Sequence, residues 1–252
     1  MPILRTEAVI LKGWKFGETS KIISVFTRDH GKIRLLVKGG RGPKSPFKGL
    51  LESLSRIGIE YYDKKTRELQ LLSKADPISI HHRIIGHVEK TTLGLAVAEL
   101  VDRAVVGEEA NRALFNQLTD YLDALDSGDG WLEGLLWHFE SRFIDLSGFQ
   151  PRWDACMTCK KSLGHAGGFF HPQSGGLLCV QCGSGRGGLV VGPETLDILF
   201  FLQTGGLDGA AKLVPTPAQK AEIRRMFDLY FRTHIEHMKS LRSLEVYYGM
   251  TS

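Results

Sequence analysis

The sequence Cys156-Met157-Thr158-Cys159, followed after nineteen residues by Cys179-Val180-Gln181-Cys182, contains all four cysteines of this 252-residue chain. In a Cys-x-x-Cys pair, two sulfur atoms lie at the tip of a tight turn, close enough to bind one ion. Two such pairs supply four thiolates in the tetrahedral arrangement that Zn²⁺ accepts without strain. The spacing is typical of a two-knuckle zinc site. We therefore expect Cys156, Cys159, Cys179 and Cys182 to bind Zn²⁺.

This zinc site is expected to be structural, because four cysteines close the coordination shell whereas a catalytic zinc keeps one position open. His165 and His171 lie in the spacer and are the alternative ligands. The spacer has glycines on both sides of Phe169-Phe170, which predicts a short hairpin too small for a core of its own. Two disulfides or four free thiols are the alternative. The N-terminus lacks the pattern of a secretory signal, which favours a reducing compartment in which structural disulfides are rare.

The composition is that of an ordinary globular protein, with 42% hydrophobic residues. No apolar run approaches the roughly eighteen residues of a membrane span. We expect a cytoplasmic, nucleoid-associated location.

Charge is distributed unevenly along the chain. Residues 1–75 contain 16 Lys and Arg against 7 Asp and Glu, a balance of +9, whereas the other residues contain 16 against 21, a balance of −5. Such asymmetry suggests that the N-terminal part binds a polyanion such as a nucleic acid. A solvated lysine-rich surface without a partner is the alternative.

The first 75 residues are expected to form about five short strands separated by Gly-rich turns. Five strands in so short a segment favour a small Greek-key barrel of the oligonucleotide-binding (OB) kind. The expected strands are Glu7–Trp14, Lys21–Thr27, Lys32–Lys38, Leu51–Tyr62 and Glu68–Leu72.

A flexible loop in this segment, from Lys38 to Lys48, carries a cation at every third or fourth residue. Its cations can follow a phosphate backbone and release counterions. Aromatic residues nearby are candidates for base stacking, although aromatic residues more often fill cores; they are Trp14, Phe16, Phe47, Tyr61 and Tyr62. The candidate DNA-binding residues are Lys21, Lys32, Arg34, Lys38, Arg41, Lys44 and Lys48.

The rest of the chain has the periodicity of amphipathic helices. The helix over 131–146 is apolar on most sides, and we expect it to be the central helix of a bundle. Three histidines in the first helix, His81, His82 and His87, are expected to be partly exposed rather than metal-binding. The expected helices run from Ser79 to about Val106, from Glu108 to Asp126, from Trp131 to Leu146, from Glu194 to Gln203 and from Ala218 to about Leu244.

The sequence contains no recognisable enzyme motif, and the residue order of a phosphate-binding loop is absent between Lys38 and Lys48. Glu140 and Asp145 on the 131–146 helix are possible acid–base groups, but charges on the outer edge of the helix are the more ordinary explanation. We predict that the protein is not an enzyme.

Several stretches together resemble one known family. They are Ala8-Val-Ile-Leu11, Phe16-Gly-Glu-Thr-Ser-Lys-Ile-Ile23, Phe26-Thr27, Gly31-Lys32, Val37-Lys38-Gly-Gly-Arg41, the two cysteine pairs, Phe169-Phe170 and Gly175-Gly176-Leu177. This pattern resembles the bacterial recombination mediator family RecO over most of the chain. It departs from many members at His237-Met-Lys-Ser-Leu-Arg242, where those members have a basic stretch beside a Leu-Lys-Ser.

The resemblance implies an α+β multidomain protein. Its parts would be an N-terminal OB-fold barrel (1–78), an α-helical domain (79–150 and 189–252) and a four-cysteine zinc knuckle inserted into it (151–188). It implies a DNA repair and recombination mediator that binds single- and double-stranded DNA, anneals complementary strands and helps load RecA onto DNA coated with single-stranded-DNA-binding protein (SSB). RecR, RecF and the C-terminal tail of SSB are the implied partners.

Two other functions fit the same residues. An RNA-binding zinc protein would prefer ribo- over deoxyribo-oligomers. A protein–protein adaptor would use its basic face to bind acidic peptides and would not anneal DNA.

Overall fold

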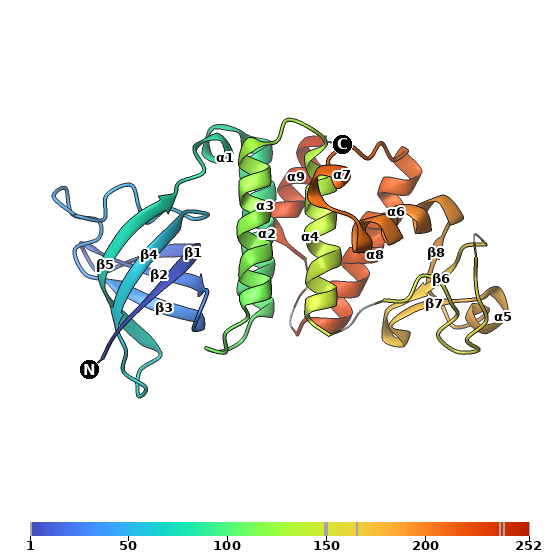
Figure 1. The fold of residues 1–252 in the computed structure, drawn as a ribbon, viewed down its shortest axis with the longest axis horizontal. Coiled ribbons are helices and arrows are strands. Elements are labelled where there is room, and N and C mark those ends of the chain that lie inside the picture. Colours follow the sequence, from blue (N-terminus) through green and yellow to red (C-terminus); the bar gives the residue numbers. More distant parts are fainter. Residues whose placement is uncertain (1, 149–150, 165, 237, 239, 252) are drawn as a thin grey trace. The chain divides into compact units, whose positions relative to one another are not determined.

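The structure is a computed structural model that describes every residue except 1, 149–150, 165, 237, 239 and 252. The chain divides into two compact units (Figure 1). The first contains Met1–Ser127 and Leu241–Ser252, and the second contains Gly128–Ser240. A barrel at the N-terminus followed by helices confirms the predicted α+β class.

The N-terminal barrel is closed and has the strand order β1-β2-β3-β5-β4. The β3–β5 pair is parallel, and the other pairs are antiparallel. The last strand extends farther than expected, so the residue predicted to begin the first helix, Ser79, instead ends a strand. The strands are β1 (Ile3–Phe16), β2 (Ser20–Thr27), β3 (Gly31–Val37), β4 (Arg56–Tyr62) and β5 (Leu69–Ser79).

Alternate residues of these strands fill the barrel, as the period of two in side-chain direction requires. Leu51, in the long β3–β4 loop, closes the same core, and Phe47 packs against it. The buried cluster consists of Ala8, Ile10, Ile23, Val25, Ile33, Leu35, Val37, Leu51, Ile57, Ile59, Tyr61 and Leu72.

The single helix predicted over 79–106 is in fact two helices, α1 (His82–Gly86) and α2 (Val88–Ala104). His87 separates them with an extended backbone (φ −126°, ψ 119°). His81, expected to be partly exposed, is only 4% exposed. Its ring nitrogens contact the Leu54 carbonyl at 2.8 Å and the Asp123 carboxylate at 3.0 Å. These contacts hold the chain in a left-handed conformation (φ 38°) that non-glycine residues rarely adopt.

Asp102 on α2 connects this helix to three barrel strands. Its carboxylate accepts hydrogen bonds from Lys12 on β1 at 2.5 Å and from Ser24 on β2 at 2.7 Å. Its backbone carbonyl accepts from Lys32 on β3. Burial alone would raise the pKa of Asp102, but the hydrogen bonds and the charges of Lys12 and Lys32 outweigh it and lower the pKa below its ordinary value of 3.8. The ionised carboxylate therefore stabilises the fold.

The next helix, α3 (Arg112–Ser127), also packs on the barrel. Phe115 lies 6.1 Å from Phe26 of β2, measured between ring centroids. Because Val25 points into the barrel core, Phe26 points outward, and it is fully buried by the helix. The helices thus cover the outer surface of β1 and β2.

The second unit is organised around α4 (Leu132–Leu146), in which only Arg142, Asp145 and Leu146 are not buried. This confirms that the helix is buried on most sides, although the helices over 82–127 belong to the first unit and not to one bundle with α4. The other elements of this unit are β6 (Gly168–His171), a 3-10 helix (Pro172–Ser174), β7 (Gly176–Leu178), α5 (Val180–Gly183), β8 (Leu189–Val191), α6 (Pro193–Thr204), α7 (Leu207–Ala210) and α8 (Pro217–His234).

The predicted C-terminal helix is shorter than expected, because α8 ends at His234 and a separate helix, α9 (Arg242–Thr251), follows. The two helices pack in different units. In the first unit, Ser243 and Tyr247 of α9 hydrogen-bond Glu99 and Glu89 of α2.

Glu140 is not on the outer edge of α4, which corrects the expectation from sequence. It is 2% exposed, and none of the described residues donates a hydrogen bond to it. Burial, together with the negative charges of Glu133 and Asp228, raises its pKa well above the ordinary value. Glu133 is equally buried but is paired with Arg224, at 2.6 and 3.1 Å. Asp145 is partly buried and accepts a hydrogen bond from Gln203.

We predict that Asp102→Asn lowers the free energy of unfolding by about 1–3 kcal/mol at pH 7, the usual cost of losing hydrogen bonds to a charged group. Because the folded-state pKa of Asp102 is lowered, the wild-type advantage should begin to shrink as the pH falls below about 4 and should vanish once the pH is below the folded-state pKa. Urea unfolding at pH 7 and pH 3.5 measures this difference. Asp120→Asn, at an exposed position on α3, is the control. A difference independent of pH would contradict the prediction.

Glu140→Gln should have the opposite effect. A carboxyl with a raised folded-state pKa loses stability as the pH rises above its ordinary pKa, so the neutral amide should be more stable at pH 8 by roughly 1–3 kcal/mol. The two proteins should converge near pH 4. Glu133→Gln, two helical turns away, breaks the Arg224 pair and should destabilise the protein. Chemical denaturation across this pH range provides the measurement, and a less stable Glu140→Gln at pH 8 would refute the prediction.

Candidate nucleic-acid interface and metal centre

The four cysteines come together at one end of the three-stranded β7-β6-β8 sheet. Their sulfur atoms all lie within 4.8 Å of one another. The first pair is joined to β7 by a backbone hydrogen bond from Met157 to Leu177 at 2.8 Å, and the second pair lies where β7 meets α5. The Sγ atoms of Cys159 and Cys179 are 3.8 Å apart, far beyond the disulfide length of about 2.05 Å. The cysteines are free thiols in an arrangement that can hold a metal ion.

The ionisation of these thiols also favours a cation. Burial opposes ionisation of Cys156, but backbone N–H groups of Cys159, Cys179 and Thr158 outweigh it and lower its pKa to about 6. Hydrogen bonding with Cys179, followed by burial, raises the pKa of Cys182 to about 12. The Cys156 thiol therefore ionises readily, whereas ionisation of the Cys182 thiol needs a nearby positive charge. A divalent metal supplies that charge.

The two alternative histidine ligands differ in what the structure describes. His171 does not belong to the cysteine group, and its Nδ1 atom contacts the Ser174 hydroxyl at 3.0 Å. His165 lies outside the described residues.

Aromatic packing attaches this segment to the helices of its own unit. Phe170 of β6 lies between Trp153 and Tyr230 of α8, with ring-centroid distances of 6.0 and 6.4 Å. The hairpin β6–β7 predicted around Phe169-Phe170 is present. The hairpin contributes few core residues, so a metal ion would add the cross-link that it lacks.

Two of the seven predicted DNA-binding residues are engaged inside the barrel unit. The Lys21 ammonium donates to the Leu51 carbonyl at 2.5 Å and lies 3.5 Å from Glu52. Lys32 is partly buried against α2, where burial lowers its pKa despite the opposing charge of Asp102. Both side chains hold barrel loops and helices in place.

The other five predicted residues are exposed on β3 and on the loop that follows it. The loop has a defined structure. It consists of successive hydrogen-bonded turns, and its Arg41 amide donates a hydrogen bond to the Thr19 carbonyl at 2.8 Å. The Arg41 guanidinium also faces the carbonyls of Gly17 and Glu18. The exposed residues are Arg34, Lys38, Arg41, Lys44 and Lys48.

The β4–β5 loop adds cations that the sequence reasoning did not select. Lys65 and Arg67 are exposed there, and the run Lys64-Lys65-Thr66-Arg67 was the available signal. Gln70, only 2% exposed, holds this loop from inside. Its amide accepts from the Lys64 N–H at 2.9 Å and donates to the carbonyls of Lys64 and Arg67 at 3.1 and 2.7 Å. The sequence signal for these hydrogen bonds was a glutamine at an inward position of an apolar strand.

The candidate stacking residues differ in their exposure to solvent. Tyr61 is 2% exposed and belongs to the barrel core, and Phe47 packs against that core. Trp14 and Phe16, near the β1–β2 turn, are 38% and 50% exposed. Tyr62 is partly exposed on the outer face of β4.

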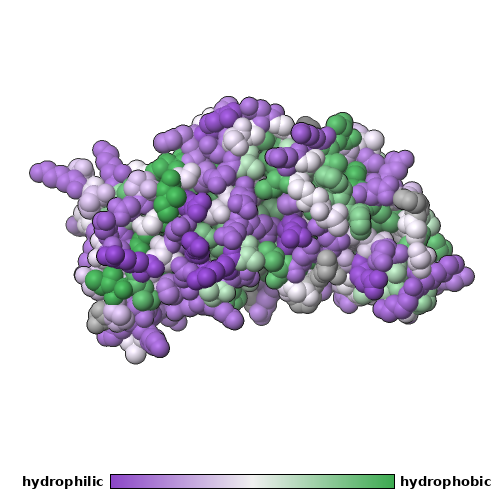
Figure 2. Space-filling view, in the orientation of Figure 1, coloured by the Kyte–Doolittle hydropathy of each residue, from purple (hydrophilic) through white to green (hydrophobic). Residues whose placement is uncertain are grey.

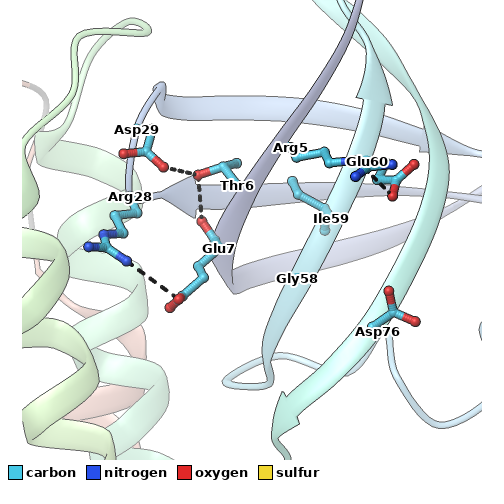
Figure 3. A pocket seen from close by; sticks show the side chains of 9 residues that line it. All are labelled: Arg5, Thr6, Glu7, Arg28, Asp29, Gly58, Ile59, Glu60 and Asp76. Atoms are coloured by element: carbon cyan, nitrogen blue, oxygen red, sulfur yellow. Dashed lines mark hydrogen bonds and ion pairs between the residues drawn. The ribbon is translucent and has the colours of Figure 1, made fainter.

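A shallow depression on the barrel surface contains charges of both signs (Figure 3). Its residues are Arg5, Thr6, Glu7, Arg28, Asp29, Gly58, Ile59, Glu60 and Asp76. Each of its carboxylates is paired with a cation, in the pairs Glu7–Arg28, Glu7–Arg56, Asp29–Arg112, Glu60–Arg5 and Asp76–Lys74. These compensated charges do not form a phosphate site.

Within the described part of the chain, no helix combines the length and apolar character that crossing a membrane requires.

Comparison with known proteins agrees with this architecture. Residues 1–81 match the family described as Recombination protein O N terminal, and residues 86–245 match Recombination protein O C terminal. Among curated proteins named DNA repair protein RecO, that of Geobacter metallireducens is 31% identical over 221 residues, which cover 88% of each chain. That of Anaeromyxobacter sp. (strain Fw109-5) is 29% identical over 92% of this chain and 91% of the relative. That of Alkaliphilus metalliredigens is 25% identical over 97% and 98%, respectively. The chain belongs to the recombination protein O (RecO) family of DNA repair proteins.

Proposed function

We propose that this protein is a recombination mediator that binds single- and double-stranded DNA, anneals complementary strands and helps load RecA onto SSB-coated DNA. The observation that carries the proposal is the group of five exposed cations on β3 and the β3–β4 loop, in a chain of the RecO family. We call this group the basic surface; it consists of Arg34, Lys38, Arg41, Lys44 and Lys48. Its role needs no catalytic chemistry.

The basic surface would act on the phosphate backbone. Flexible Lys and Arg side chains neutralise phosphates without reading bases, and a mediator must tolerate every sequence. Two strands bound on one cationic surface no longer repel each other fully, which favours their encounter and annealing. Lys21 and Lys32 would contribute indirectly, by holding the β3–β4 loop and α2 against the barrel.

A division of the chain into three functional parts would suit a mediator with several partners. The barrel (1–78) would bind DNA, and the helical domain (79–150 and 189–252) would bind the C-terminal tail of SSB. RecR and RecF would join the same assembly, in the cytoplasm at the nucleoid. His237 and Lys239, where the sequence departs from many members, lie outside the described residues.

The cysteine group would hold a structural Zn²⁺. Four thiolates complete its shell, so the ion would cross-link the segment 151–188 and would not activate water.

Replacing Lys38, Arg41 and Lys44 together by Ala should weaken binding to single-stranded DNA and make it less sensitive to salt. Three lost phosphate contacts predict a reduction of about 2 in the slope of log affinity against log salt. Fluorescence anisotropy at several salt concentrations measures this slope. The control is Lys212→Ala, Arg225→Ala and Arg242→Ala together, which removes the same charge from exposed positions outside the barrel. An unchanged slope in the first variant would refute this placement of the DNA site.

The annealing of complementary SSB-coated strands, without ATP, tests the function itself. Fast annealing that slows with salt supports a mediator. Preference for ribo-oligomers would favour an RNA-binding protein, and binding of acidic peptides without annealing would favour an adaptor.

The metal proposal predicts one zinc per chain by elemental analysis. Removal of zinc by a chelator, or Cys156→Ser, should lower the melting temperature by several degrees, because the segment loses its cross-link. His171→Asn is the control and should keep the metal content unchanged. Normal thermal stability of Cys156→Ser with lost DNA binding would overturn the structural assignment.

A further inference from the structure

An apolar row crosses the outer surface of the barrel on β3, β5 and β4 and ends at the first residue of β1. The strand pairing places Leu36 of β3 beside Leu71 of β5, Leu71 beside Tyr62 of β4, and Tyr62 beside Ile3 of β1. These side chains point outward, because their chain neighbours Leu35, Leu72, Tyr61 and Leu4 fill or pack against the barrel core. We call these four residues the outer row: Ile3, Leu36, Tyr62 and Leu71.

The outer row is accessible to a ligand. Ile3 is 49% exposed, and the other three side chains are partly exposed. Figure 2 shows hydrophobic patches among hydrophilic side chains on the part of the surface that contains the barrel. A tyrosine within an apolar row offers a flat ring to a planar ligand.

Cations border the outer row on both sides. Arg34 lies two residues before Leu36 on the same face of β3, and Lys38 follows the end of that strand. On the other side, Tyr62 leads into the β4–β5 loop, where Lys65 and Arg67 are exposed and Gln70 fixes the backbone. Asp63 and Glu68 are the acids of that loop, and its cations Lys64, Lys65 and Arg67 outnumber them.

We propose that the outer row is a stacking platform for the bases of a single-stranded nucleic acid. This rests on the function proposed above and adds the path of the strand: from the basic surface, across β3, β5 and β4, to the β4–β5 loop. Tyr62 stacks on a base, while Arg34, Lys65 and Arg67 bind the flanking phosphates. Cations on both sides of an apolar row match a polyanion with planar bases better than an apolar protein surface.

This path differs from the usual one in OB folds, where ligands bind the face of strands 2 and 3. Here the outward Phe26 of β2 is buried under α3, and Lys32 of β3 is bound to α2. The helices thus occupy part of the usual face. The strand is displaced toward β5 and β4.

Stacking also suits annealing. A base held by its π-face keeps its hydrogen-bonding edge free, so a complementary strand can pair with it while it is bound. The platform would therefore select bases over bare backbone without selecting a sequence.

The test compares a thymidine oligonucleotide with an abasic oligonucleotide of equal length and charge. Wild-type protein should bind the thymidine oligonucleotide roughly tenfold or more tightly, from stacking worth about 1–3 kcal/mol per base. Tyr62→Ala should lose most of this preference with an unchanged salt slope, and Tyr62→Phe should keep it. Phe16→Ala, an exposed aromatic outside the outer row, is the matched control. The melting temperature of each variant is measured alongside, and Ile3→Ser, at the exposed end of the row, provides a second test with less risk to folding.

The outcomes separate this inference from the proposed function. Salt-sensitive binding of both oligonucleotides without preference for bases, or a preference that survives Tyr62→Ala, overturns the platform and leaves the basic surface intact. If Phe16→Ala loses the preference for the thymidine oligonucleotide, bases stack at the β1–β2 turn instead, and the proposal that the outer row is the platform is overturned. Absence of salt-sensitive binding by the wild-type protein overturns both.

Discussion

The contact between α2 and the barrel, centred on Asp102, determines which part of the barrel is available for binding. A closed barrel has no sheet edges, so a ligand can bind only to its outer surface or its loops. Asp102 binds Lys12, Ser24 and Lys32 from three successive strands, and this places the helices over β1 and β2. Three of the four outer-row residues lie on the remaining strands, β3, β4 and β5, and the exposed cations lie on β3 and the loop that follows it. Folding and binding therefore depend on the same ion-pair network.

The second unit satisfies a different constraint, because its core accommodates ionisable groups. Glu133 is buried with a partner, Arg224, while Glu140 is buried without a described one. Such an uncompensated carboxyl stays neutral at a stability cost that apolar packing on the same helix must exceed. The cysteine segment of this unit has little core of its own. Metal binding there would supply stability that hydrophobic burial cannot provide.

Local patterns were sufficient for much of the fold. The Cys-x-x-Cys spacing predicted the cluster, and alternating residues predicted the barrel strands, since both depend on short-range geometry. The predictions of helix ends and of side-chain burial were wrong where contacts between residues distant in sequence decide them. Neither the extended backbone at His87 nor the end of α8 at His234 is marked by a glycine or proline at that position, and the burial of Glu140 depends on elements distant in sequence. The same reason explains why the sequence did not distinguish the engaged Lys21 and Lys32 from the exposed Arg34 and Lys38.

The outer row shows that the pairing register of the strands reveals neighbouring surface residues that the amino-acid sequence alone does not. Ile3, Leu36, Tyr62 and Leu71 are separated in sequence by up to 68 positions, and each looks like an ordinary strand residue. Only strand pairing reveals that they are neighbours on one surface. Between the cations of β3 and those of the β4–β5 loop, such a row would add base stacking to the phosphate contacts. Phosphate contacts provide affinity that salt can weaken, and stacking provides affinity that salt leaves largely unchanged. A mediator that must hold a strand during annealing would gain from both, because stacking leaves the hydrogen-bonding edge of each base free for a complementary strand while the phosphates remain bound.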